Sequence, residues 1–289
     1  MKKVLAALDS SVAGKSVLAS ARALAALLDC EVEALHVQTD GRRTVRSLAA
    51  AADIPLRTTR GSIVERLIES GESPNVVALA IGARGAPTSP RPLGGTAAAV
   101  AAALSKPVLI VPPDAEPPKM FRHVLVPLEG SVSSSLVPRW LFELTGGAQV
   151  DVVALHIHDQ ESIPAFTDQP QHEVSAWTRE FVQRYCPWGV GTVRLETRVG
   201  RIGELVPLVA EECGCDLIAL GWSQQLSPGR ASVVRETLER SHLPVLLVPV
   251  DVSPDLRDVL AASAVATPVR SGRDRKREEL ERLASRRVR

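Results

Sequence analysis

The chain repeats itself, and this repeat limits the possible folds more than any other feature of the sequence. The segment KKVLAALDSS (residues 2–11) matches RHVLVPLEGS (122–131), and EVEALHV (31–37) matches DVVALHI (151–157). Further matches follow in the same order: VVALAIG (76–82) with DLIALG (216–221), and SKPVLIVP (105–112) with HLPVLLVP (242–249). The sequence therefore indicates a tandem duplication.

The two copies differ in length at one place. Equivalent positions lie 120 residues apart up to His36 and His156, and 139 residues apart from Gly61 and Gly200 to Gly82 and Gly221; a two-residue shortening before the last helix makes the final offset 137. The second copy therefore carries 19 extra residues between His156 and Gly200. We predict a first domain over residues 1–113, a Pro-rich linker over 114–120, a second domain over 121–251 and a basic tail over 252–289.

Apolar runs alternate with stretches of helical period within each copy. In the first copy, strands are predicted at 3–8, 31–37, 56–59, 76–81 and 108–111, and helices at 12–28, 42–52, 63–70 and 95–104. Runs such as VVALAI and VLIV are apolar on both faces, as strands buried in a parallel sheet must be. The predicted fold class is α/β, with two doubly wound five-stranded parallel-sheet domains in tandem.

Composition narrows the range of functions. The formal net charge of +1 does not favour a nucleic-acid partner. No run approaches the roughly 18 apolar residues of a membrane span, so no membrane association is expected. The apolar run VLAAL near the N-terminus is shorter than an export signal requires, and Asp9 ends it. We expect a cytoplasmic protein.

The cysteines and histidines favour structural roles over chemistry. The four cysteines lack C-x-x-C spacing, which favours buried free thiols over redox or metal use. His36 and His156 occupy equivalent strand ends, and this repetition favours a structural role. His156 and His158 lie two residues apart, a weak metal signal without a third ligand nearby. No metal site is predicted.

Three loops follow predicted strands, at the edge where doubly wound sheets bind ligands. They contain Asp9, Val37 and the Gly-rich segment IGARGAPTSPRPLGGTAAAV (residues 81–100). Glycines let backbone N–H groups approach an anion closely, and the start of a helix adds further donors. These loops are the candidate ligand site.

The stretch Gly14-Lys15-Ser16 offers an alternative, because it resembles the end of a phosphate-binding P-loop. The first glycine of that motif would stand where this chain has Asp9. A carboxylate accepts hydrogen bonds from hydroxyls or amines, whereas it repels phosphates. The P-loop interpretation is therefore the weaker one.

The glycine spacing resembles the nucleotide signature of the universal stress protein family. Gly82-x-x-Gly85, nine residues and then Gly95-Thr96 match its pattern G-x2-G-x9-G-[S/T]. The resemblance extends over about residues 1–250 in two copies, and it includes the acid after the first strand and the terminal PVLIVP strand. It implies a Rossmann-like fold of the adenine nucleotide alpha hydrolase type.

The resemblance also implies a ligand, ATP or another adenine nucleotide, with Mg²⁺ as an optional companion. Asp9 would contact the adenosine end and the backbone near Val37 would meet the adenine. The glycines and the helix start would hold ribose and phosphates. Arg84 would contact a phosphate, or else be a solvated loop residue. The predicted binding set is Asp9, Val37, Ile81, Gly82, Arg84, Gly85, Gly95, Thr96 and Ala97.

The second copy departs from this pattern. Glu129 replaces Asp9, Gln224 stands at the second glycine, and the helix start falls at Ser232-Val233. We expect Gln224 and the neighbouring Trp222 to occupy this cleft, which would leave the second copy as a non-binding structural or regulatory partner.

Three functions remain open at this point. The first is a stress-response regulatory or binding module that holds ATP in domain 1 and is no enzyme, with at most weak ATPase activity. The second is a scaffold that binds no nucleotide and acts through its surface and basic tail. The third is a slow nucleotide hydrolase. We also expect the final strands of the copies to pair within one chain, and a homodimer stays an open alternative.

Overall fold

The structure is a computed structural model that describes residues 1–11, 13–38, 42–84, 93–128, 150–158, 193–225 and 231–250. Several sequence predictions fall outside these ranges: Gly85, Glu129, the basic tail and most of the insertion in the second copy. Residues 1–251 form one compact unit by their contacts.

Domain 1 alternates strands with helices. Its elements are β1 (Lys3–Ala7), α1 (Gly14–Leu27), β2 (Glu31–Val37), α2 (Arg42–Ala51), β3 (Leu56–Thr59), α3 (Ile63–Gly71), β4 (Val76–Gly82), α4 (Gly95–Ala103) and β5 (Val108–Val111). The described part of domain 2 repeats this pattern with β6 (His123–Pro127), β7 (Asp151–His158), β8 (Val193–Val199), α7 (Ile202–Glu212), β9 (Leu217–Trp222), α8 (Ser232–Arg240) and β10 (Val245–Pro249).

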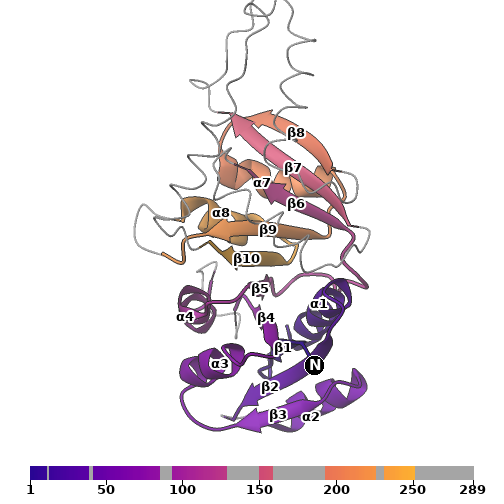
Figure 1. Ribbon diagram of the computed structural model, residues 1–289, viewed down its shortest axis with the longest axis vertical. Coiled ribbons are helices and arrows are strands. Elements are labelled where there is room, and N and C mark those ends of the chain that lie inside the picture. Colours follow the sequence, from indigo (N-terminus) through magenta and orange to yellow (C-terminus); the bar gives the residue numbers. More distant parts are fainter. Residues whose placement is uncertain are drawn as a thin grey trace, which may run out of the picture. The chain divides into compact units, whose positions relative to one another are not determined.

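Ten strands of the described chain form a single sheet in the order β3-β2-β1-β4-β5-β10-β9-β6-β7-β8 (Figure 1). Within each domain, neighbouring strands are parallel. The two halves of this order are mirror images, so both domains have the same doubly wound α/β topology. The predicted fold class is confirmed.

The domains meet at an antiparallel seam between β5 and β10. Leu109 pairs with Leu246 at its centre, flanked by the pairs Ile110–Val245 and Val108–Leu247. All the side chains in these pairs are buried. The edge strand that each domain would otherwise expose is therefore covered by the other domain of the same chain.

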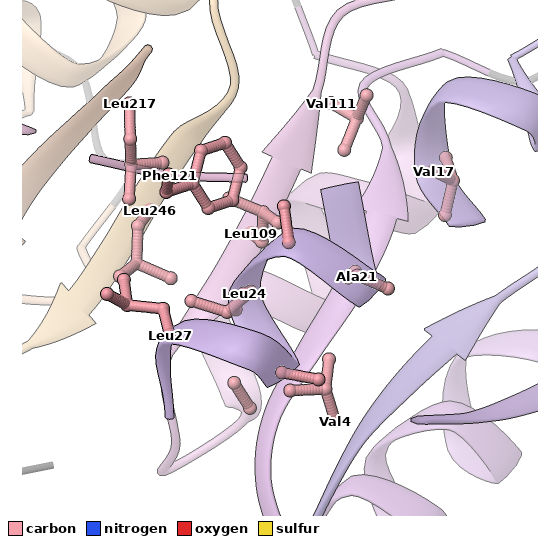
Figure 2. Close-up of a cluster of buried hydrophobic side chains, with 14 of the residues drawn as sticks. Val4, Val17, Ala21, Leu24, Leu27, Leu109, Val111, Phe121, Leu217 and Leu246 are labelled. Carbon is pink, nitrogen blue, oxygen red and sulfur yellow. The ribbon is translucent and has the colours of Figure 1, made fainter. Parts of the chain in front are cut away.

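Side chains of alternating direction build two apolar layers, one on each face of the sheet. Val4 and Ala6 of β1 belong to the layer covered by α1 and α2, whereas Leu5 belongs to the layer covered by α3 and α4. The first layer continues across the seam, because it includes Leu109 of domain 1 and Leu246 of domain 2 (Figure 2). One core thus stabilises both domains.

The segment between the domains is held by specific contacts. The buried Ser16 hydroxyl of α1 donates a hydrogen bond to the carbonyl oxygen of Ala115 at 2.8 Å. Phe121 is only 4% exposed and belongs to the first apolar layer (Figure 2).

In the part of the chain that the structure describes, no helix has the length and apolar character needed to cross a bilayer.

Candidate functional site

A cavity of about 220 Å³ lies at the carboxyl edge of the sheet in domain 1. The residues that follow β1 and β4 line it, together with the end of β2 and the first turns of α1, α3 and α4. In the strand order, β1 is the point at which the chain changes direction, since β2 lies on one side of it and β4 on the other. Doubly wound folds bind ligands at such a point.

The structure brings the predicted binding residues together in this cavity. Those that line it are Asp9, Val37, Ile81, Gly82, Arg84, Gly95, Thr96 and Ala97. Gly85, the remaining member of the predicted set, lies outside the described residues. The cavity has further lining residues that the sequence analysis did not select, among them Ser10, Ser11, Ile63, Leu67 and Gly94.

The first turn of α4 lines the cavity, and its leading backbone N–H groups have no acceptor among the described residues. Its N-cap is Gly94, whose N–H donates to the Ala83 carbonyl at 2.7 Å, and no side chain caps the helix. The first turn contains no acidic residue. The leading N–H groups of a helix lack intrahelical partners and carry partial positive charge. A Cβ atom added at Gly95 would meet no described atom within 4 Å.

The start of α1 is a second uncapped helix terminus at the same cavity. Its N-cap is Ala13, no side chain caps it, and its first turn is also free of acidic residues. Asp9 lies in the loop that leads into this helix. Its carboxylate accepts a hydrogen bond from the Ser11 N–H at 3.0 Å, which closes a tight turn.

Arg84 contributes a positive charge to the cavity wall. The residue is half-buried, and its buried Nε–H has no hydrogen-bond partner among the described atoms. Burial without a partner is unfavourable for a guanidinium group. Arg84 therefore differs from a fully solvated loop residue, and an anion in the cavity would supply the missing acceptor.

The Gly14-Lys15-Ser16 stretch does not form a phosphate loop. Ser16 is buried and bonded to Ala115, so its hydroxyl is not presented to a ligand. Lys15 is exposed and borders a separate groove between α1 and α2, beside Arg22 and Leu48. Asp9, at the start of this loop, lines the cavity instead. This arrangement agrees with the choice of the P-loop interpretation as the weaker one.

His36 and His156 make the same contact in both domains. Nδ1 of His36 lies 2.9 Å from the carbonyl oxygen of Leu8, and Nδ1 of His156 lies 2.8 Å from that of Leu128. A carbonyl only accepts hydrogen bonds, so Nδ1 carries the proton in each ring. Each histidine thus ties the end of the first strand of its domain to the second, and the predicted structural role is confirmed.

Trp222 distinguishes domain 2 from domain 1 at one equivalent position. It occupies the position that corresponds to Ala83 of the cavity wall, directly after the equivalent glycines Gly82 and Gly221. The indole is only 5% exposed and packs into the second apolar layer with Val206 and Val234. The tryptophan is much larger than the alanine at the equivalent position, and it is buried in the core of domain 2.

Gln224 does not occupy this cleft, in contrast to the sequence prediction. Its side-chain amide donates a hydrogen bond to the carbonyl oxygen of Leu104 at 2.6 Å, at the end of α4 in domain 1. The amide thus points away from the cleft of domain 2, because the carbonyl oxygens at the end of α4 lack helical N–H partners and can accept its hydrogen bonds. Helix α8 begins at Ser232, where the sequence predicts the helix start.

Residues 120–249 match the model of the universal stress protein family. This segment is therefore similar to a universal stress protein domain. The match covers domain 2, whose loop departs from the glycine signature. Domain 1, which carries the signature, is joined to this universal stress domain as a second copy of the same fold.

Solved structures show the same fold over both halves of this chain. A structure from Pseudomonas aeruginosa, described as a candidate universal stress protein, is 14% identical with a TM-score of 0.63, and covers 92% of this chain and 98% of its own. A universal stress protein from Archaeoglobus fulgidus is 18% identical with a TM-score of 0.61, covering 86% and 96%. No curated protein matches the sequence significantly.

Proposed function

We propose that domain 1 binds ATP or a related adenine nucleotide and that the chain acts as a regulatory or binding module in stress adaptation. One observation carries this proposal. The cavity combines two uncapped helix starts and Arg84 with a single carboxylate, Asp9. Such a site combines positive potential with one carboxylate that can accept hydrogen bonds.

The electrostatics of the two helix starts assign an orientation to the ligand. The negative charge of Asp9 lies in the loop before α1, so that helix start and the Ser11 N–H already stabilise it. The start of α4 has no acidic residue near its first turn, and its positive potential is therefore available for the phosphates. Asp9 is then left to accept hydrogen bonds from hydroxyl groups of the ribose.

The adenine would pack against aliphatic side chains. Val37, Ile63, Leu67 and Ile81 line the cavity, and domain 1 contains no Phe, Trp or Tyr. Aromatic stacking is therefore excluded in domain 1. Backbone groups near Val37 would supply the hydrogen bonds that distinguish adenine from other bases.

The residues around the cavity favour binding over hydrolysis. Of its titratable side chains, Asp9 lies at the adenosine end, and His36 is 2% exposed with Nδ1 committed to Leu8. Among the described residues no group of three or more His, Cys, Asp or Glu gathers to hold a metal ion. Mg²⁺ would therefore arrive with the phosphates rather than occupy a protein site of its own.

The cheapest test is to denature the purified protein and identify the released small molecules by mass spectrometry. Isothermal titration calorimetry with ATP and with ADP, each with and without Mg²⁺, then gives the affinity. Binding of an adenine nucleotide at one site per chain would support the proposal. Absence of binding under all these conditions would leave the scaffold function as the better one.

Two substitutions test the location of the nucleotide. Asp9→Ala should weaken ATP binding by about 1–3 kcal/mol, with exposed Glu116→Ala as a control for loss of a carboxylate. Gly95→Leu should abolish binding because its side chain enters the cavity without a clash in the protein. Ala103→Leu, at the exposed opposite end of α4, is its control. Wild-type affinity in both site variants would place the nucleotide elsewhere.

A further inference from the structure

Helix α4 is held at both ends by different parts of the molecule. Its first turn lines the cavity of domain 1. At its other end, the side-chain amide of Gln224 donates to the carbonyl oxygens of Leu104 at 2.6 Å and Ala101 at 3.4 Å. The last carbonyl oxygens of a helix have no intrahelical N–H donors, so the amide of Gln224 caps α4 from the other domain.

The side chains of α4 provide little other anchorage. Six of its nine residues are alanine, and only Ala97, Val100 and Ala101 are buried. Small side chains bury little apolar surface and make few dispersion contacts. Polar contacts at the ends of the helix therefore carry an unusually large share in fixing its position. The second such contact is within domain 1, where Glu72 accepts from the backbone N–H and the hydroxyl of Ser105, both at 2.7 Å.

Gln224 has an unfavourable backbone conformation. Its φ of 59° is left-handed, a region that glycine adopts freely and other residues avoid. The residue stands at the position that corresponds to the second glycine of the nucleotide signature. A glycine there would relieve the backbone but could not reach Leu104, so the strain accompanies the contact between the domains.

We propose that Gln224 is a positioning residue for the nucleotide site of domain 1, which rests on the function proposed above. It holds α4 with its first turn facing the cavity. A helix of nine residues is a stiff rod of roughly 13 Å, so a shift at the Gln224 end moves the donors at the other end. The loop of domain 2 that contains Gln224 thereby influences the affinity of domain 1 for the nucleotide. Conversely, nucleotide binding in the cavity changes the stability of this loop.

Two variants of Gln224 separate positioning from folding. Gln224→Ala removes the amide, and Gln224→Gly removes it while also relieving the left-handed backbone, so this variant should fold at least as well. The neighbouring Gln225 is exposed and makes no hydrogen bond within the described structure, which makes Gln225→Ala the matched control.

Calorimetry with ATP and hydrogen exchange of α4 are the two measurements. Both Gln224 variants should bind ATP about tenfold more weakly, and the amides of residues 100–104 should exchange faster. Coupling between two sites is reciprocal, so ATP should also slow exchange of residues 221–225 in the wild type but not in Gln224→Gly. Gln225→Ala should behave like the wild type throughout.

The outcomes distinguish this proposal from the proposed function. If the wild type binds ATP and the Gln224 variants bind it equally well, Gln224 does not position the site. If the wild type binds no ATP, the nucleotide function fails, and exchange of α4 alone decides the role of Gln224. Faster exchange in both Gln224 variants but not in Gln225→Ala would then support positioning, and unchanged exchange would refute it.

Discussion

The two domains carry side chains of very different size at one equivalent position. Ala83 leaves a cavity open in domain 1, whereas Trp222 at the equivalent position is almost fully buried in domain 2. If this indole is an integral part of the domain 2 core, Trp222→Ala should lower the free energy of unfolding by about 3–5 kcal/mol. Urea denaturation measures the loss.

Leu208→Ala provides the control for this prediction. Leu208 is 49% exposed on α7 of the same domain, so its truncation should change stability by no more than about 0.5 kcal/mol. A similarly small loss for Trp222→Ala would show that the indole fills no essential space, and domain 2 would then have to be reconsidered as a binding site.

The cysteines allow a second prediction at this scale. Burial raises the pKa of the Cys215 thiol to about 12, so its thiolate fraction at pH 8 is on the order of 10⁻⁴. Iodoacetamide should leave Cys215 unmodified in the native protein and label it after denaturation. Cys213 is less buried and should react first; equal native rates for the two thiols, measured by peptide mass spectrometry, would contradict the assignment.

The location of the candidate site could be predicted from the sequence, because loops after parallel strands converge at one edge of the sheet whatever their separation along the chain. The partner of Gln224 could not. Leu104 lies 120 residues earlier, in the other domain, and no local pattern connects the two residues. Ile63 and Leu67 were also missed, because their apolar spacing is that of any amphipathic helix.

At the scale of elements, the strands were easier to predict than the helix ends. β2, β3 and β5 have the predicted bounds. For β5 the reason is plain, because its sequence VLIV is an apolar run bounded by prolines. Helix α1 begins at Gly14 rather than at the predicted residue 12. The hydrogen bond from the Ser11 N–H to Asp9 forms a turn that delays the helix, and apolar periodicity carries no signal for such a turn.

The edge strand β8 makes a pH-dependent contribution to stability. Burial alone would raise the pKa of the Glu196 carboxyl, but hydrogen bonds from Arg194 and Arg198 hold it below its ordinary value. A lowered pKa in the folded state stabilises the protein above the unfolded pKa of about 4.3, and this contribution disappears as the pH falls through the folded value.

Glu196→Gln should therefore flatten the acid side of the stability curve. The wild type should be more stable by about 0.5 kcal/mol at neutral pH, as is typical of ion pairs near the surface, and the difference should vanish in acid. Urea denaturation at a series of pH values below 6 checks this. A difference that stays constant across the series would mean that the carboxyl charge does not contribute.

At the scale of the whole molecule, the seam between β5 and β10 joins two domains of the same chain, so the two domains associate within one molecule. The midpoint of thermal unfolding should therefore not change with protein concentration over about a 100-fold range, because no subunits dissociate. Differential scanning calorimetry at several concentrations tests this. A midpoint that rises with concentration would reveal a homodimer coupled to folding, through some surface other than the seam.

The seam has a further consequence for how this molecule can change over time. In a homodimer encoded once, every substitution appears in both subunits, so an indole that closes one cleft would close its twin as well. Here the two faces of the seam are encoded separately. Residues such as Trp222 and Gln224 could therefore arise in one copy while the other kept its glycines and its cavity, so selection can act on the two copies separately.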